Sequence, residues 1–251
     1  MSQKAIIFFE DFVKQFDLEK DKSNIESYYH KYHHTYRVMK KIEELGHLLH
    51  LNQEEMEFAK TIALFHDLGR FHQLKKTKQY DDLKTNFDHA KESIFILEEN
   101  NWFINEAISE DVKEIISFAI LNHNQYEIEQ TPNETSSYFA KLLRDANKLV
   151  IMTEMNPVLK DSSISKEVLQ EFQKEMLIHR QNIQTPLDNI LGYLGFLFDL
   201  NFKETIILLE QEKILESYWL CLEKNLDFNT FHELQEIVNK YLEKRKKEML
   251  C

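Results

Sequence analysis

Two chargeable side chains stand side by side in the stretch TIALFHDLGRFHQLKK, residues 61–76. His66 continues an apolar stripe through Ala59 and Ala63 at the spacing of one helix face, and Asp67 follows directly. An apolar helix face turns toward the protein interior. An ionised carboxylate or an unpaired imidazole is costly there unless it is hydrogen-bonded, paired with a charge or bound to a metal ion. The pair therefore predicts a buried polar site.

Further polar groups extend apolar stripes in the same way. His123 lies four residues after Ala119, Asp145 lies three residues after Leu142, and His34 lies on a face that advances in steps of four. Since these groups come from separate predicted helices, we expect them to share one partner. Imidazole and carboxylate ligands suit iron, manganese, nickel or zinc. The inward-facing groups are His34, His66, Asp67, His89, His123 and Asp145.

The elements that carry these groups are predicted to be helices. The 251 residues include only 4 Gly and 3 Pro, which is too little turn chemistry for a many-stranded sheet. Asn52 with Glu55 forms a capping-box signature at the start of the helix that leads to the His-Asp pair. A polar linker is expected at 72–87, followed by a helix from about Asp88 to Leu97. The fold class is therefore predicted to be all-α.

Two domains are expected. Residues 1–155 carry all the candidate polar groups and are predicted to form a metal-binding helical core, and residues 156–251 a helical extension that packs on it. Helices of the extension are predicted at 165–183, 187–200, 203–224 and 229–248.

Charge and composition exclude several classes of partner. Lys and Arg total 31 against 43 Asp and Glu, so a net charge of −12 repels the backbone of a nucleic-acid polymer. Two cysteines give no disulfide framework, which favours a reducing, cytoplasmic setting. The first residues have the stripe of a core helix rather than a signal sequence. The most apolar run, 190–198, is shorter than the ~20 residues that span a bilayer, so no membrane association is expected.

Five stretches taken in order resemble the motifs of the HD-domain superfamily, metal-dependent phosphohydrolases named for an adjacent His-Asp pair. They are HHTYRV, FHDLGRF, DHAKES, LNHNQ and LLRDANKLV, and they cover roughly residues 28–152. The resemblance implies a helical bundle whose facing helix ends hold metal. For this chain it implies an HD-domain helical bundle with a C-terminal helical extension.

The resemblance also implies a ligand set. HD domains with two additional histidines between the pair and the last aspartate usually hold two ions, and His89 and His123 fill those places. Asp67 would then bridge a binuclear centre of two divalent transition metal ions. Two such ions ~3.5–4 Å apart activate water and stabilise the entering and leaving oxygens of a phosphoryl displacement. By this likeness His34, His66, Asp67 and Asp145 hold one ion, and Asp67, His89 and His123 hold the other.

Basic residues near the pair are candidates for binding phosphate. Arg70 follows Gly69, which is expected to end a helix, and a guanidinium takes phosphate oxygens bidentately. A structural ion pair is the alternative for Arg70. Lys75 and Lys148 complete a cationic rim and are predicted to bind substrate, with plain solvation as the alternative for Lys75.

The stretch YYHKYHH lies one turn before the first ligand. In cyclic-nucleotide phosphodiesterases, a branch of the same superfamily, a similar YH supplies the proton to the leaving oxygen, so the likeness makes His30 a candidate catalytic acid beside Asp67 and Arg70. Lys31 replaces the asparagine common in that motif and is predicted to meet substrate phosphate. Asn147 stands where related sequences often carry a second aspartate.

These features predict a phosphomonoesterase or phosphodiesterase that acts on a small phosphorylated metabolite or nucleotide. Two alternatives stay open at this point. A di-iron oxygenase of the same superfamily, acting on a phosphonate or a polyol, has a similar set of histidines and aspartates, and a nucleotide sensor would keep the fold without turnover. A homodimer is also an open option.

Overall fold

The computed structural model describes residues 2–16, 24–154 and 163–248. These residues form helices and no strand among them, which confirms the all-α prediction. The chain divides into two compact units, Met1–Asn147 and Lys148–Cys251. The domain boundary expected after residue 155 lies outside the described residues.

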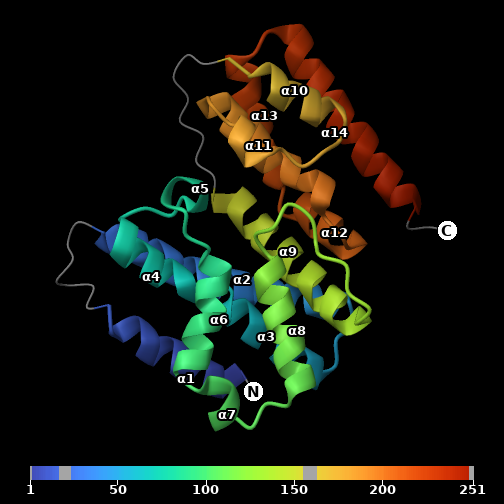
Figure 1. Ribbon diagram of the computed structural model, residues 1–251. Helices are drawn as coiled ribbons and strands as arrows, with labels where there is room; N and C mark the ends of the chain where they lie inside the picture. The colour runs from blue at the N-terminus through green and yellow to red at the C-terminus, as the bar shows by residue number, and fades with distance from the viewer. Residues whose placement is uncertain (1, 17–23, 155–162, 249–251) are drawn as a thin grey trace. The chain divides into compact units, whose positions relative to one another are not determined.

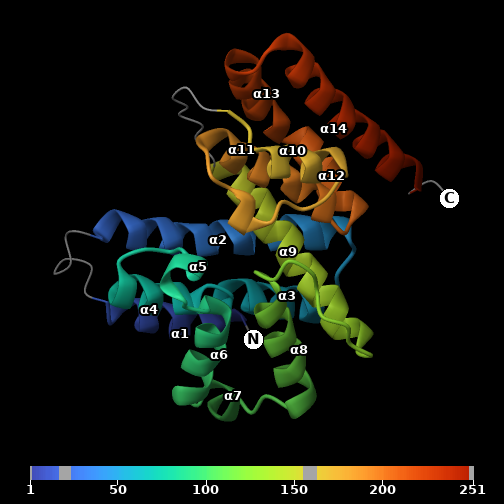
Figure 2. The same cartoon turned by 45° about the horizontal axis from the view of Figure 1, so that its top comes forward.

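Helix α3 packs against more than one other helix of the first unit and is buried over its second half. It packs against α1, α2 and α8, while α4 packs against α6, and α6 lies beside α8 (Figures 1 and 2). All residues from 61 to 71 are buried, so the chain leaves α3 and enters α4 without reaching the surface. The helices of this unit are α1 (Ser2–Lys14), α2 (Ile25–Leu48), α3 (Gln53–Phe65), α4 (Leu68–Thr77), α5 (Asp82–Thr85), α6 (His89–Glu99), α7 (Trp102–Asn105), α8 (Glu110–Asn122) and α9 (Glu134–Glu154), which belongs to it as far as Asn147.

Local capping sets where these helices begin. The capping box predicted for α3 is confirmed, because Asn52 Oδ1 accepts from the Glu55 backbone N–H and Glu55 Oε2 accepts from the Asn52 backbone N–H. Asp88 caps α6 by accepting from two backbone N–H groups, which places His89 at the first helical position. His66 ends α3 and Asp67 precedes α4.

The linker predicted at 72–87 is wrong. Helix α4 continues to Thr77, and the short helix α5 follows. Gln73 is fully buried, and its Nε2 donates to Asp82 Oδ1 at 2.8 Å and to Thr85 Oγ1 at 3.1 Å. The Gln73 side chain therefore stabilises this segment through internal hydrogen bonds instead of facing water, which the sequence pattern does not distinguish.

Gly69 has a different role from the one predicted. It lies in the first turn of α4, and no described glycine has a positive φ. A Cβ at this position would lie 2.1 Å from the backbone oxygen of His89. The Gly69 N–H donates to Ser93 Oγ at 2.9 Å, and Ser93 Oγ lies 3.0 Å from His66 O and 2.9 Å from His89 O. Glycine is needed because α4 and α6 approach closely here.

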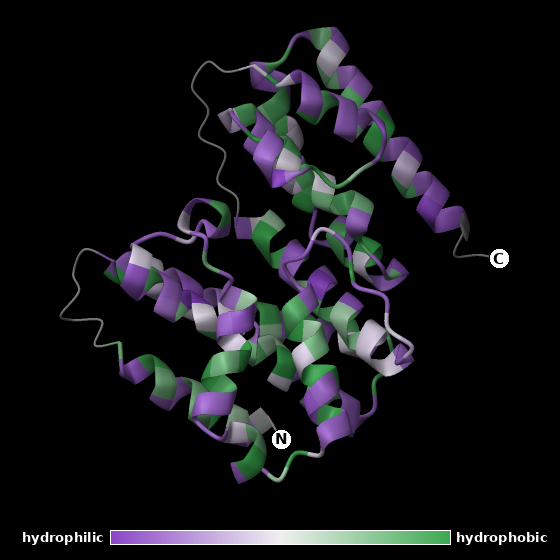
Figure 3. Cartoon of the chain, in the orientation of Figure 1, coloured by the Kyte–Doolittle hydropathy of each residue, from purple (hydrophilic) through white to green (hydrophobic). Residues whose placement is uncertain are grey.

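The second unit is also helical, but three predicted helices are shorter than expected. The α-helix predicted at 187–200 ends at Leu194, and a 3-10 turn follows it. The helix predicted at 165–183 ends at Gln173, and the one predicted at 203–224 is interrupted at Lys213, which has a φ of 54°. As in the first unit, each helix carries both hydrophobic and hydrophilic residues (Figure 3). Among the described residues, no helix is both long and apolar enough to span a bilayer. The helices are α10 (Lys166–Gln173), α11 (Pro186–Leu194), α12 (Lys203–Gln211), α13 (Ile214–Asn225) and α14 (Phe228–Glu248), with 3-10 turns at Arg180–Asn182 and Gly195–Asp199.

Replacing Gly69 by alanine should lower the free energy of unfolding by about 1–3 kcal/mol or more, because a backbone oxygen cannot move aside as a side chain can. Urea unfolding followed by circular dichroism measures the loss. Gly46→Ala is the matched control. Its Cβ would meet the flexible end of Met56 at 2.6 Å, and alanine favours a helix over glycine by about 1 kcal/mol. An equal loss in both variants would contradict the close contact.

Candidate metal centre

The two carboxylate oxygens of Asp67 face two different pairs of histidines. Oδ2 lies 3.8 Å from His34 Nε2 and 3.5 Å from His66 Nε2. Oδ1 lies 3.4 Å from His89 Nε2 and 3.7 Å from His123 Nε2. All five side chains are buried, and each oxygen with its histidines forms a group compact enough to hold one ion. One carboxylate therefore lies between two sets of nitrogen donors.

Four of these residues lie at helix ends. His66 and Asp67 occupy the corner between α3 and α4, His89 begins α6, and His123 follows α8. His34 is the exception, since it lies within α2. Because these helix ends lie close together, their side chains meet at one point and no long loop is needed to carry them there.

Hydrogen bonds at Nδ1 orient three of the imidazoles. The rings of His66 and His123 each have Nδ1 at 2.6 Å from the backbone oxygen three residues earlier, Ala63 O and Ile120 O respectively. His89 Nδ1 lies 2.6 Å from Asp82 Oδ2. A ring that donates from Nδ1 presents an unprotonated Nε2, which is the form that binds a metal.

The donor set fits a divalent transition metal. His66 Nε2 is buried and has no hydrogen-bond partner among the described residues. The Nε2 atoms of His89 and His123 are only 3.0 Å apart. Two nitrogen lone pairs at that distance repel each other unless a proton or a cation lies between them. An unsatisfied buried nitrogen and a close pair of nitrogens are both explained by metal ligation.

Burial and nearby charge keep His66 and His89 neutral and Asp67 ionised, which are the protonation states that bind a metal. Burial lowers the pKa of His66 well below its ordinary value and that of His89 to about 4, so both imidazoles are neutral at pH 7. Burial alone would raise the pKa of Asp67. The positive charges of Lys31 and Arg70 outweigh burial and hold the Asp67 pKa well below its usual range.

Asp82 was missed by the sequence reasoning. Its Oδ2 accepts from His89, and its Oδ1 accepts from Arg70 Nη1 at 2.5 Å and from Gln73. Burial would raise the Asp82 pKa, but His89 and Arg70 lower it to about 2. A carboxylate behind a ligating histidine orients the ring and raises its basicity. Asp82 lies in a polar stretch with no helical stripe, so nothing in its sequence spacing to His89 indicates the contact.

Lys31, His30 and Asn147 lie against this cluster. Lys31 Nζ donates to Asp67 Oδ2 at 2.9 Å and lies 5.5 Å from the centre of the Tyr80 ring. His30 is exposed, and its ring stacks on that of His34 with centroids 6.3 Å apart, one turn earlier on the face that the spacing predicts. Asn147 Oδ1 lies 3.0 Å from His34 Nε2.

Asp145 is fully buried on α9 but belongs to neither histidine group, so its role as a ligand stays a prediction.

Arg70 is buried, and its Nη1 donates to Gln73, to Tyr80 O and to Asp82. The bond to Asp82 is an ion pair, which was the alternative to phosphate binding for this residue. Its substrate-binding role also stays a prediction.

Two predicted lysines are engaged away from Asp67. Lys75 is exposed, with Nζ 5.7 Å from the centre of the Phe16 ring. Lys148 belongs to the second unit, where it pairs with Asp199 and lies 5.6 Å from the centre of the Phe196 ring. None of these contacts involves Asp67, and both assignments stay predictions.

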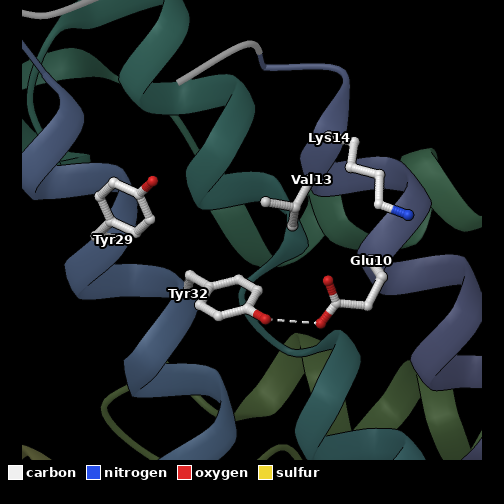
Figure 4. Close-up of a pocket in the computed structure, with 5 residues that line it drawn as sticks. All are labelled: Glu10, Val13, Lys14, Tyr29 and Tyr32. Carbon is white, nitrogen blue, oxygen red and sulfur yellow. Dashed lines mark hydrogen bonds between the residues drawn. The ribbon is translucent and has the colours of Figure 1, made fainter. Parts of the chain in front are cut away.

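A separate shallow pocket lies between α1 and α2. It is lined by Glu10, Val13, Lys14, Tyr29 and Tyr32, and Tyr32 donates to Glu10 Oε1 at 2.8 Å (Figure 4). Its lining contains none of the predicted ligands. The histidines around Asp67 are therefore not part of this pocket.

Comparison with known families gives a match to part of the chain. A family model described as HD domain matches residues 32–169, which is more than half of the chain and includes all six predicted ligands. Comparisons with curated proteins and with solved structures give no match.

The metal-free protein should lose stability as the pH falls from about 6.5 to about 4. Over this range the unfolded chain binds a proton at His89 and the folded chain does not, so acid favours unfolding. Each histidine of this kind contributes about 1.4 kcal/mol per pH unit. Urea unfolding in a chelating buffer at a series of pH values measures the slope. His89→Gln should reduce this slope by about 1.4 kcal/mol per pH unit, the contribution of one proton. An unchanged slope would contradict the lowered pKa of His89.

Asp82→Asn should weaken metal binding by about 10–100-fold, because it removes the charge behind His89 while keeping the volume of the side chain. Competition with a chromophoric chelator measures the affinity. Asp81→Asn is the matched control, since Asp81 accepts from the Lys84 N–H at the start of α5. Equal losses in the two variants would show that only the fold of α5 matters.

Proposed function

We propose that the chain is a phosphohydrolase, because it belongs to the HD-domain family, which in general consists of metal-dependent hydrolases. The reaction that we propose is cleavage of a phosphate ester or anhydride in a small nucleotide-like substrate. HD enzymes in general act on small phosphorylated substrates. The net charge of −12 disfavours a nucleic-acid polymer, so the substrate class that we propose is a small phosphorylated metabolite or nucleotide.

The observation that supports this proposal most is the position of Asp67 between two pairs of histidine nitrogens. HD domains bind divalent metals. We propose two ions here, iron, manganese, nickel or zinc, one held by His34, His66 and Asp67 with Asp145, and the other by Asp67, His89 and His123. Bound ions would activate water for attack on phosphorus and neutralise charge on the phosphoryl oxygens.

Basic side chains beside the cluster would bind and orient the phosphate. Lys31 is nearest, with its ammonium 2.9 Å from Asp67 and partly covered by Tyr80. A compact cation beside the ligands can hold a phosphoryl oxygen. Arg70 contributes positive charge from inside the site, with Nε 3.6 Å from Asp67 Oδ1. Lys75 and Lys148 are the remaining proposed phosphate contacts, and they would have to leave their present partners to serve.

His30 is the proposed general acid. Its ring is exposed and stacks on His34, so it can exchange a proton with solvent while lying one helical turn from the ligands. In this role it would protonate the leaving oxygen. Asp67 would fix the positions of both sets of donors, and Arg70 would hold the phosphate during transfer.

Replacing Asp67 by alanine should remove the bound metal and lower phosphate release by at least about 100-fold, because changes to groups behind the ligands already cost 10–100-fold. Elemental analysis gives the metal content, and a screen of phosphorylated metabolites under argon gives the rate. His34→Gln should behave similarly. His33→Gln, on the exposed neighbour of His34, should keep both metal and rate.

The same preparations distinguish the competing chemistry. Oxygen uptake by the iron-loaded protein with phosphonates or polyols, and no phosphate release under argon, would replace the hydrolase by the di-iron oxygenase. Nucleotide binding with no product at any metal loading would favour a sensor. Full metal content and rate in Asp67→Ala would show that Asp67 is not the bridging ligand.

A further inference from the structure

Arg144 is a buried cation that the proposed mechanism does not use. Its relative exposure is 0%, and it is among the largest fully buried side chains of the described chain. Burying a guanidinium is costly unless its donors are satisfied. Arg144 Nη1 donates to Asn122 O at 2.7 Å and to Gln125 O at 2.6 Å, and Nη2 donates to Tyr126 O at 3.2 Å. One side chain of α9 therefore holds three backbone oxygens of another segment.

These oxygens lie on both sides of His123. Asn122 is the last residue of α8, and the chain beyond it is irregular until α9 begins. The last carbonyl groups of a helix have no partner within the helix and carry partial negative charge. Arg144 supplies donors and positive charge at this point. It binds the carbonyl just before His123 and two carbonyls after it, so the backbone of His123 is held from both directions.

His123 depends on this contact more than the other ligands at helix corners do. His66 is followed at once by α4, and His89 begins α6, so a helix continues on the far side of each. His123 is followed by a loop, which returns to bond the Asn122 side chain through the Glu129 N–H at 2.7 Å. A ligand must lie within about 0.2 Å of its proper distance from a metal. A loosened turn at His123 would exceed that tolerance.

We infer that Arg144 is a positioning residue for His123, and through it for the histidine pair that faces Asp67 Oδ1. The inference rests on the proposed function, since it assigns the residue to one of the two proposed metal positions. The three oxygens that Arg144 bonds belong to the backbone around His123 and not to its ring. Arg144 holds the turn that aims His123 Nε2 at His89 Nε2, 3.0 Å away, and at Asp67 Oδ1, 3.7 Å away.

The test is a zinc titration of the full-length protein, with total zinc from elemental analysis and affinities from a chromophoric chelator. Wild-type protein should bind two Zn²⁺ per chain. Arg144→Lys, which keeps the charge but loses the fork of donors, and Arg144→Gln should each weaken one of the two sites by about 10–100-fold and leave the other unchanged. If circular dichroism shows that Arg144→Gln does not fold, Arg144→Lys carries the test.

Arg245 offers a matched control. It also donates to two backbone oxygens, from Nη2 to Leu200 O at 3.0 Å and to Asn201 O at 3.2 Å, but it lies in the second unit. Arg245→Gln should cost stability and keep both zinc sites. Adding Arg144→Gln to His123→Gln should change zinc affinity no further, because the residue through which Arg144 acts is already gone.

The outcomes separate the two proposals. Wild-type protein that binds fewer than two Zn²⁺ overturns the binuclear centre, and the inference with it. Two sites in wild type that stay unchanged in Arg144→Lys overturn the inference alone. Equal weakening of both sites, or a further loss when Arg144→Gln is added to His123→Gln, shows a general structural role and also overturns it.

Discussion

The first unit depends on keeping one carboxylate ionised inside a protein core. Asp67 is 3% exposed, and its pKa lies well below the usual range although burial opposes this. A buried anion is tolerated only where positive charge and hydrogen-bond donors surround it. Four imidazoles and the ammonium of Lys31 lie around Asp67. These groups come from separate parts of the chain, which helix packing brings together. The helix packing around α3 can thus be understood as a means of bringing those donors to one point.

The surrounding structure orients the donors through contacts that are not themselves ligands. The His66 and His123 rings are held by carbonyl oxygens of their own helices, and the His89 ring is held by Asp82. Ser93 connects the backbone of His66 to that of His89 at the point where α4 meets α6. Rings held in this way keep their nitrogens pointed inward, which favours a rigid site over one that assembles around its ion.

Helical periodicity was enough to predict much of the site. His66 and His123 continue apolar stripes, and the structure buries both beside Asp67. The contributions of Asp82 and Arg144 could not be predicted in this way, because their partners are a side chain across a turn and backbone oxygens of another helix end. Such contacts have no fixed spacing. Gly69 was misassigned for a related reason, since a close approach between helices and a helix end both favour glycine.

The segment that joins α4 to α6 carries a consequence for how proteins of this kind diverge. Asp82 reaches His89 on one side and Arg70 on the other, and Tyr80 of the same segment covers Lys31. Loops are where related enzymes usually exchange sequence to acquire new substrates. Tyr80, which lies against the proposed phosphate contact Lys31, therefore shares a short stretch of chain with Asp82, which supports the proposed metal ligand His89. Exchanging this segment would alter ion affinity together with substrate selectivity, so the two properties are expected to evolve together.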